Sequence, residues 1–144
     1  AANSRLDSLQ AVIGNRLIEN VEFITNQRII NAERYDTALA DLSPFVRIPK
    51  RRKEVKHVYH LYMIRVERRD ELLIYLNSKG VEAKIHYPVP VHLQPAAKSM
   101  GYKKGDFPVS EADSEYIITL PAHQHLTDEE ISYTIDQVRS FYTE

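Results

Sequence analysis

The sequence contains no cysteine and no tryptophan, and only four of its 144 residues are glycine. Without cysteine the chain forms no disulfide, no thiolate zinc site and no thiol nucleophile. No Gly-rich phosphate-binding loop is recognisable, and no apolar run approaches the roughly 20 residues of a membrane span. The net charge of −1 creates no overall field that attracts nucleic acid or an anionic membrane. These absences favour a cytoplasmic protein that binds neither nucleic acid nor a membrane.

What the sequence does contain is typical of an ordinary globular domain. Apolar residues make up 43% of the chain and charged residues 27%. A chain of this length buries roughly 70% of the surface that it exposes when unfolded, which is enough for one core. The chain starts at Ala1 with neither an initiator methionine nor a secretion signal. We therefore expect it to be a processed or truncated product.

The first 42 residues have the pattern of one or two long helices. Ser4 to Asp7 has the spacing of a capping box, in which two side chains satisfy free amides at a helix start. Apolar residues then recur every three or four positions, at Leu6, Leu9, Ile13 and Leu17. A second stripe with similar spacing is apolar except for one arginine, and consists of Val21, Ile24, Arg28, Ala32, Tyr35, Leu39 and Leu42. Gly14 and Asn20 are the candidate positions for a bend or break.

The middle of the chain changes to a period of two. Residues 55–67 are rich in β-branched and aromatic residues on both faces, which predicts a strand buried on two sides. Residues 69–79 follow as a helix that ends at Gly80. Residues 81–85 alternate as a half-exposed strand, and the prolines after it forbid a regular ladder.

Two further capping boxes predict the remaining helices. Ser110 to Asp113 opens a short helix to about Ile118, and Thr127 to Glu130 opens the last one. A short strand lies between them. The predicted class is α+β, with a long N-terminal helical stretch followed by a small, mainly antiparallel sheet covered by helices.

Histidines and basic residues are the first candidates for chemistry. His57 and His60 are three apart in the predicted strand, so their rings point to opposite faces and cannot share a metal ion. His123 and His125 lack an adjacent carboxylate cluster, and no metal site is expected. The basic run 50–53 has neither aromatic residues interleaved with it nor a recognition helix, which favours a solvated loop over a nucleic-acid interface.

The most unusual stretch is residues 85–94. It concentrates His86, Tyr87, His92 and Gln94 where a predicted strand ends and two prolines stiffen the backbone. Imidazole and phenol groups donate hydrogen bonds to phosphate or sugar oxygens. A Pro-rich loop with a packed aromatic and a histidine that serves only the backbone explains the pattern equally well. From the residues alone both interpretations stay open.

At this stretch the chain resembles the DegT/StrS nucleotide-sugar aminotransferases. Residues 79–88 and the pattern Pro90-x-His92-x-Gln94-Pro95 are similar to a hallmark of that family. Further similar segments occur in the family's order and spacing, at residues 3–11, 107–112, 120–123 and 126–131. The resemblance covers nearly the whole chain.

The resemblance implies an aspartate-aminotransferase-like (fold type I) enzyme that uses pyridoxal phosphate (PLP). Members work as homodimers with shared active sites and transfer an amino group, generally from glutamate, to a keto group of a nucleotide-sugar. Asn3 would contact the cofactor phosphate of the neighbouring subunit. His86, Tyr87 and His92 would face the active site and the nucleotide-sugar. Arg5 occupies a motif position, although it also suits an ion pair at a helix start.

The departures from the family pattern are as informative. The Schiff-base lysine, the acid that pairs with the pyridine nitrogen and the group stacked on the ring all lie before the Asn-x-Arg motif in that family. Only two residues precede Asn3 here. The resemblance therefore implies a C-terminal portion without a catalytic residue of its own, in which residues 1–42 lead from a missing N-terminal large domain and residues 43–144 form the small domain.

Alternatives remain. Some members of that family have lost the lysine and dehydrate sugars, and the deciding position is not in this sequence. A free-standing α+β module that binds a ligand or regulates a partner also fits the element order. A non-catalytic interaction protein, with residues 4–42 as a dimerisation element, is the third interpretation.

We expect the purified 144-residue chain to show no transaminase activity, because PLP needs a lysine anchor and a pyridinium partner to act as an electron sink. The measurement is the absorbance of protein-bound PLP together with glutamate-dependent turnover. A bound-cofactor band accompanied by turnover would contradict this expectation.

Overall fold

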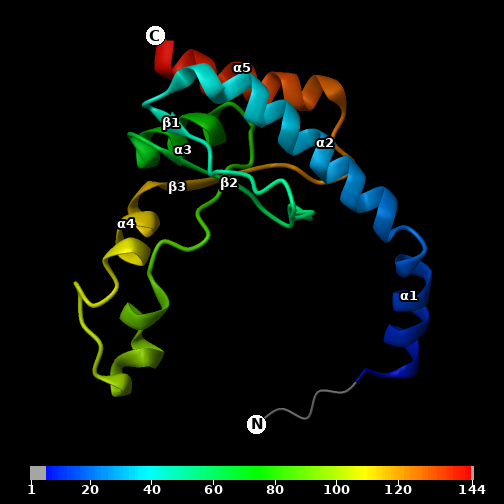
Figure 1. Ribbon diagram of the computed structural model, residues 1–144, viewed down its shortest axis with the longest axis horizontal. Helices are drawn as coiled ribbons and strands as arrows, with labels where there is room; N and C mark the ends of the chain where they lie inside the picture. Colours follow the sequence, from blue (N-terminus) through cyan, green and yellow to red (C-terminus); the bar gives the residue numbers. More distant parts are fainter. Residues whose placement is uncertain (1–5, 144) are drawn as a thin grey trace.

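The computed structural model describes residues 6–143, which form helices around a small sheet (Figure 1). The α-helices are α1 (Ser8–Ile18), α2 (Val21–Leu39), α3 (Arg69–Ser78), α4 (Pro108–Tyr116) and α5 (Asp128–Thr143). The strands are β1 (Val46–Arg47), β2 (Tyr62–Val66) and β3 (Ile117–Leu120). Short 3-10 turns are η1 (Ala40–Leu42), η2 (Val91–Leu93) and η3 (Pro95–Met100). The predicted α+β class is confirmed.

The sheet is antiparallel, with strand order β1-β2-β3. In the central strand β2, Tyr62, Ile64 and Val66 are buried, while the residues between them are only partly buried. Helices α2 and α5 pack against each other beside the sheet, and α3 packs against α5 (Figure 1). The segment from η2 to α4 leaves this core as a separate lobe at the β3 end of the sheet (Figure 1).

The predicted helical stretch is confirmed as two helices, although its start differs from the prediction. Asp7 is the N-cap of α1: its carboxylate accepts from the Gln10 amide at 2.8 Å, and the Gln10 side chain accepts from the Asp7 amide. Ser4, the other member of the predicted box, lies outside the described residues, and Asp7 precedes the helix as its N-cap. The break falls at Asn20, while Gly14 lies within α1.

The strand predicted over residues 55–67 is wrong for its first half. Only Tyr62–Val66 is extended and paired. Tyr59 adopts φ 44°, a left-handed conformation that ends an extended run. Tyr62 pairs with Leu120, and the next residue of the partner, Pro121, has no N–H with which to continue the ladder. The length of β2 is therefore set by its partner and not by its own composition.

The strand predicted over residues 81–85 is reduced to one bridge. Lys84 donates its amide to the Thr119 carbonyl at 3.1 Å and accepts from the Thr119 amide at 2.8 Å. Val81 and Ala83 are still buried, as the alternation predicted. Gly80, at φ +79°, takes the left-handed conformation predicted for the residue that ends α3.

The capping box predicted at Ser110 is also wrong. Helix α4 starts earlier, with Pro108 in its first turn, and it ends at Tyr116 so that the chain enters β3 at Ile117. Asp113 forms an ion pair with Arg65 of the sheet instead of capping the helix. The last predicted box is confirmed: Thr127 and Glu130 exchange side chain to amide hydrogen bonds at 3.2 and 2.8 Å at the start of α5.

Helix α1 contributes nothing to the core. It has no buried residue, and its apolar side chains are among the most exposed of the chain, at Leu9 (71%), Val12 (66%) and Ile18 (70%). A stripe of this kind marks a contact surface. No helix formed by residues 6–143 is long and apolar enough to cross a membrane.

We expect the isolated chain to self-associate through α1, or else to leave that helix frayed. An isolated helix of 11 residues is shorter than the roughly 12–15 residues needed for stability in water. Hydrogen exchange should be faster in α1 than in α5 at low concentration, and sedimentation should detect association as concentration rises. The double variant Leu9→Gln/Leu17→Gln should lower the association, whereas Ile74→Gln, at an equally exposed position of α3, should not. A compact monomer with a fully protected α1 would contradict the prediction.

Candidate functional site

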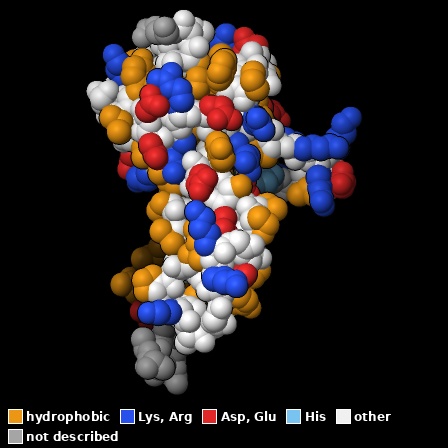
Figure 2. Space-filling model, turned by 90° about the vertical axis from the view of Figure 1, so that its left-hand side faces the viewer, with side chains coloured by type: hydrophobic (Ala, Val, Ile, Leu, Met, Phe, Trp, Pro, Cys, Tyr) orange, Lys and Arg blue, Asp and Glu red, His pale blue; other side chains and the backbone are white. Residues whose placement is uncertain are grey.

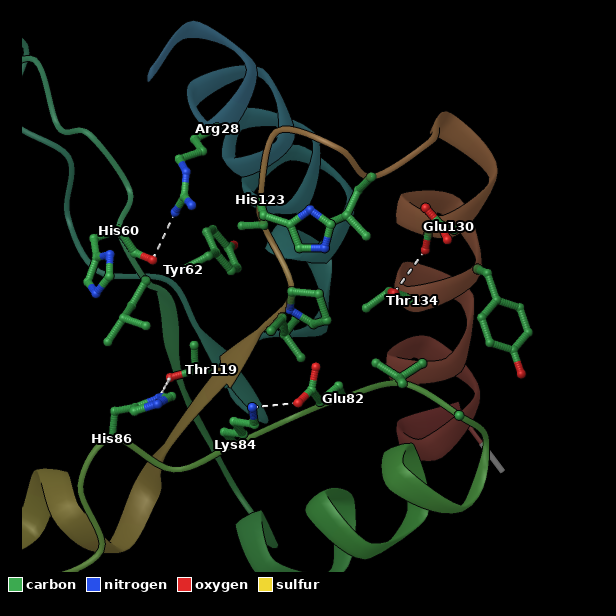
Figure 3. Close-up of a pocket in the computed structure, with 18 of the residues that line it drawn as sticks. Arg28, His60, Tyr62, Glu82, Lys84, His86, Thr119, His123, Glu130 and Thr134 are labelled. Carbon is green, nitrogen blue, oxygen red and sulfur yellow. Dashed lines mark hydrogen bonds and ion pairs between the residues drawn. The ribbon is translucent and has the colours of Figure 1, made fainter. Parts of the chain in front are cut away.

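A cavity of about 710 Å³ opens where the start of β2, the end of β3 and the start of α5 come together (Figure 3). Three imidazoles line it, from His60, His86 and His123, together with the cationic side chains of Arg28 and Lys84. No group of three or more side chains able to hold a metal ion occurs among residues 6–143. Apolar side chains, among them Leu120 and Val81, also line the cavity.

Arg28 builds the wall of this cavity on the α2 side. One terminal nitrogen donates to the backbone carbonyls of Tyr59 and His60, each at 3.0 Å, and Nε donates to the Gln124 side chain at 3.3 Å. These contacts join α2 to two loops that are distant in sequence. Through these hydrogen bonds Arg28 fixes the position of the His60 backbone. Its positive charge lies against the negative ends of two carbonyl dipoles.

His86 lies at the opposite wall, two residues after Lys84, which bridges to β3 (Figure 3). Its Nδ1 is 3.0 Å from the Thr119 hydroxyl, and the tautomer decides which of the two donates. The bridge of Lys84 to the Thr119 backbone fixes the segment, and the Thr119 side chain fixes the ring. Nε2 is then the ring nitrogen left for a ligand.

The other side of the cavity is acidic. Glu82, Glu129 and Glu130 line it near the start of α5. The ammonium of Lys84 is 2.5 Å from Glu82, and this hydrogen bond and charge hold the pKa of the Glu82 carboxyl below its usual value. A ligand that spans the cavity thus meets His60 and His86 on one side and the carboxylates on the other (Figure 3).

The residues predicted for substrate binding are brought together only in part. His86 lines the cavity, whereas Tyr87 does not: its ring is 67% exposed and stands edge-on to His86, with centroids 5.6 Å apart. Asn3, predicted to contact the cofactor phosphate, lies outside the described residues, as does Arg5.

His92 lies away from the cavity, inside the lobe. Its Nε2 donates to a Glu111 carboxylate oxygen at 2.9 Å, and both side chains are nearly buried. The same carboxylate accepts from the amides of Gly105 at 2.9 Å and Phe107 at 3.3 Å. Desolvation raises the pKa of the Glu111 carboxyl, but the bonds from Gly105, His92 and Phe107 outweigh it and leave that pKa below its ordinary value. This contact closes the loop between η2 and α4.

Sequence reasoning missed Arg28, Thr119 and Glu111 as parts of these arrangements. A signal existed for Arg28, because it is a charged residue in an otherwise apolar helical stripe. Glu111 was read as part of a helix cap, although its partners are residues on the N-terminal side of α4. Thr119 carried no signal, since a threonine in a strand is ordinary.

The described residues do not by themselves fit a PLP site. The cavity contains one lysine, Lys84, whose side chain is 56% exposed and ion-paired with Glu82. A Schiff-base lysine must direct its nitrogen at the cofactor aldehyde, whereas the Lys84 nitrogen is directed at the Glu82 carboxylate. Residues 6–143 thus line the cavity with hydrogen-bonding groups and offer no anchor for the cofactor.

Comparison with known proteins gives a consistent result. The DegT/DnrJ/EryC1/StrS aminotransferase family matches residues 1–139. The chain is 36% identical over 141 residues to a pleiotropic regulatory protein of Geobacillus stearothermophilus, covering 97% of this chain and 38% of that protein. It is 34% identical over 139 residues to dTDP-3-amino-3,4,6-trideoxy-alpha-D-glucose transaminase of Streptomyces venezuelae, covering 96% of this chain and 36% of that enzyme.

Solved structures agree. The crystal structure of S. venezuelae DesV in complex with a ketimine intermediate superimposes with a TM-score of 0.94 at 33% identity, over 100% of this chain and 38% of that one. A DegT DnrJ EryC1 StrS aminotransferase from Brucella abortus gives a TM-score of 0.89 at 32% identity, over 100% of this chain and 38% of that one. The chain spans little more than a third of the length of these relatives.

We expect acid to loosen the lobe through Glu111. Because the folded pKa of this carboxyl is lowered from 4.5, the stability that it contributes is present above that value and is lost as the pH falls through the folded pKa. Hydrogen exchange at the Gly105 and Phe107 amides, measured across that window, should show protection disappearing. In Glu111→Gln the protection should be weaker at neutral pH and should no longer change in the window. Glu115→Gln, on the exposed side of the same helix, is the control. An unchanged pH response in Glu111→Gln would contradict the assignment.

Proposed function

The chain belongs to the DegT/DnrJ/EryC1/StrS aminotransferase family, and from this premise we propose that it is the C-terminal part of a PLP-dependent enzyme that transfers an amino group, from glutamate, to the keto group of a nucleotide-linked sugar. Among the chain's own residues, the position of His86 is the observation that supports this proposal. Its Nδ1 is fixed by Thr119, and its Nε2 is left for a ligand at the wall of a cavity large enough for a small organic molecule. Relatives named as transaminases favour amino transfer over the dehydration alternative.

We assign the substrate side of the reaction to the segment that follows Lys84. In the tautomer whose Nδ1 accepts from the Thr119 hydroxyl, His86 Nε2 is a donor, and with the hydroxyl of the exposed Tyr87 it suits sugar hydroxyl or phosphate oxygens. PLP, when bound, supplies the electron sink for the exchange of the amino group. Asn3 is the proposed contact to the cofactor phosphate of the neighbouring subunit.

For His92 we propose a role through the loop. Its Nε2 is bonded to Glu111, its side chain is nearly buried, and it does not line the cavity at His86. An anchored His92 instead sets the path of the chain from Tyr87 onward, since Gln94 also donates to the Val89 carbonyl at 3.3 Å.

The proposed organisation follows the family. Residues 1–42 lead from an N-terminal large domain, residues 43–144 form the small domain, and the enzyme works as a homodimer in the cytoplasm. The exposed apolar stripe of α1 supports the first part of this proposal, because such a stripe needs a covering surface. The absence of cysteine fits a cytoplasmic location.

A chimera tests the proposed function directly. This chain would replace the matching 38% of the S. venezuelae structure on which it superimposes with a TM-score of 0.94. We expect glutamate-dependent amination of a nucleotide-linked keto sugar, and we expect His86→Ala to lower kcat/KM for the sugar at least about tenfold, the order of one good hydrogen bond.

The matched control is His125→Ala, which removes an exposed imidazole that does not line the cavity. Equal activity of both variants would reject the assignment of His86. A folded, PLP-loaded chimera without any amination of the sugar would reject the proposed function.

A further inference from the structure

A second cavity, of about 560 Å³, lies between α2 and the segment that joins β1 to β2. It shares no lining residue with the cavity at His86. The neighbouring residues Tyr59 and His60 line different cavities, so this segment is the partition between them. The basic run, which the proposed function does not use, contributes Lys50, Arg51 and Arg52 to the lining.

Arg51 is the structural member of the run. Its Nε and a terminal nitrogen donate to the two Asp36 carboxylate oxygens at 2.8 and 2.9 Å, and its guanidinium lies over the Tyr59 ring at 5.2 Å. Asp36 also accepts from the Tyr62 hydroxyl at 2.8 Å. A bidentate pair of this kind is geometrically specific. It ties the segment to α2, and it cancels one positive charge against one negative charge.

The other cations of the segment are not neutralised. Lys50 and Arg52 are exposed and form no ion pair among residues 6–143, and Lys56 is 3.9 Å from Glu22 with both side chains largely in water. Exposed pairs at such a distance contribute little. Figure 2 shows Lys and Arg side chains gathered on a projection from one side of the molecule. Lys50, Arg52 and Lys56 all line the second cavity.

The cavity also offers an imidazole donor and an apolar wall. His57 Nδ1 accepts a hydrogen bond from the Tyr59 amide at 3.0 Å, so a neutral His57 ring carries its proton on Nε2, where it can donate to an anion. Ile29, Pro49 and Val55 line the remaining wall with the Tyr59 ring. Exposed cations beside an apolar wall suit a ligand that is charged at one end only.

We propose that this cavity binds a phosphorylated organic small molecule of the nucleoside diphosphate class, with its phosphates at Lys50, Arg52 and Lys56 and its apolar portion against the wall of Ile29, Val55 and Tyr59. Glu33 also lines the cavity, and it forms no ion pair among the described residues. Its carboxylate opposes an anion there. The site needs only α2 and the segment 49–59, so it stands whether or not the chain takes part in amino transfer.

The test is a titration of the full 144-residue chain, at low salt, with pyrophosphate and with uridine 5′-diphosphate, followed by amide chemical shifts. Saturable shifts are expected at residues 49–59 and in the facing turns of α2. Uridine 5′-diphosphate should bind more tightly than pyrophosphate, because it adds contact with the apolar wall. Lys50→Gln/Arg52→Gln should weaken both about tenfold or more, since two charge-assisted contacts are lost, and Glu33→Gln should tighten both several-fold.

The matched control is Lys103→Gln/Lys104→Gln, which removes the same charge from exposed lysines that line neither cavity. All these substitutions are at exposed positions, and the amide spectrum of each variant reports directly that it is folded. Equal weakening by both double variants would show a net-charge effect and overturn the site. Absence of saturable shifts would overturn it as well, and equal affinity for the two ligands would overturn the role of the apolar wall.

Discussion

The docking of α2 onto the first residues of β2 is the contact on which the rest of the molecule depends. Tyr35 and Tyr62 are fully buried and stack with their centroids 4.8 Å apart. Their hydroxyls remain satisfied, because Tyr35 donates to the Pro121 carbonyl at 2.8 Å and Tyr62 donates to Asp36. Burial raises the pKa of Tyr35 to about 12 and that of Tyr62 still further, so both phenols stay neutral donors. A buried polar network of this kind is stabilising only when every member has its partner.

The contact between α2 and β2 positions the walls of both cavities. Arg28 reaches from α2 to the carbonyls of Tyr59 and His60, and it shapes the wall of the cavity at His86. Two turns further along the same helix, Asp36 holds Arg51 at the other cavity. The segment between β1 and β2 is thus fixed at two places by one helix. A disturbance of the tyrosine stack would change the geometry of both cavities together, while changes at the rim of one should leave the other unaffected.

The sequence predicted those parts of the structure whose causes are local. The Thr127 to Glu130 box, the stop at Gly80 and the break at Asn20 each depend on a few neighbouring residues, and each was found. The ends of the strands were not predicted. Strand β2 begins at Tyr62 because its partner β3 ends before Pro121, which cannot continue the pairing. His86 was singled out by its place in a family motif, but its fixed orientation comes from Thr119, a contact across 33 positions that no local pattern contains.

The distribution of burial implies a gradient of local stability. The sheet, α2, α3 and α5 share one core, whereas α1 buries no residue and the lobe exposes Val91, Met100 and Val109. Segments with few buried apolar contacts open at low free energy, and ligand-binding elements are commonly drawn from them. Tyr87 lies at the boundary, next to a residue fixed by β3 and at the entrance to a lobe closed by Glu111. A ligand held between His86 and Tyr87 would therefore couple the rigid core to the lobe, and its binding energy would be reduced by the cost of ordering that lobe.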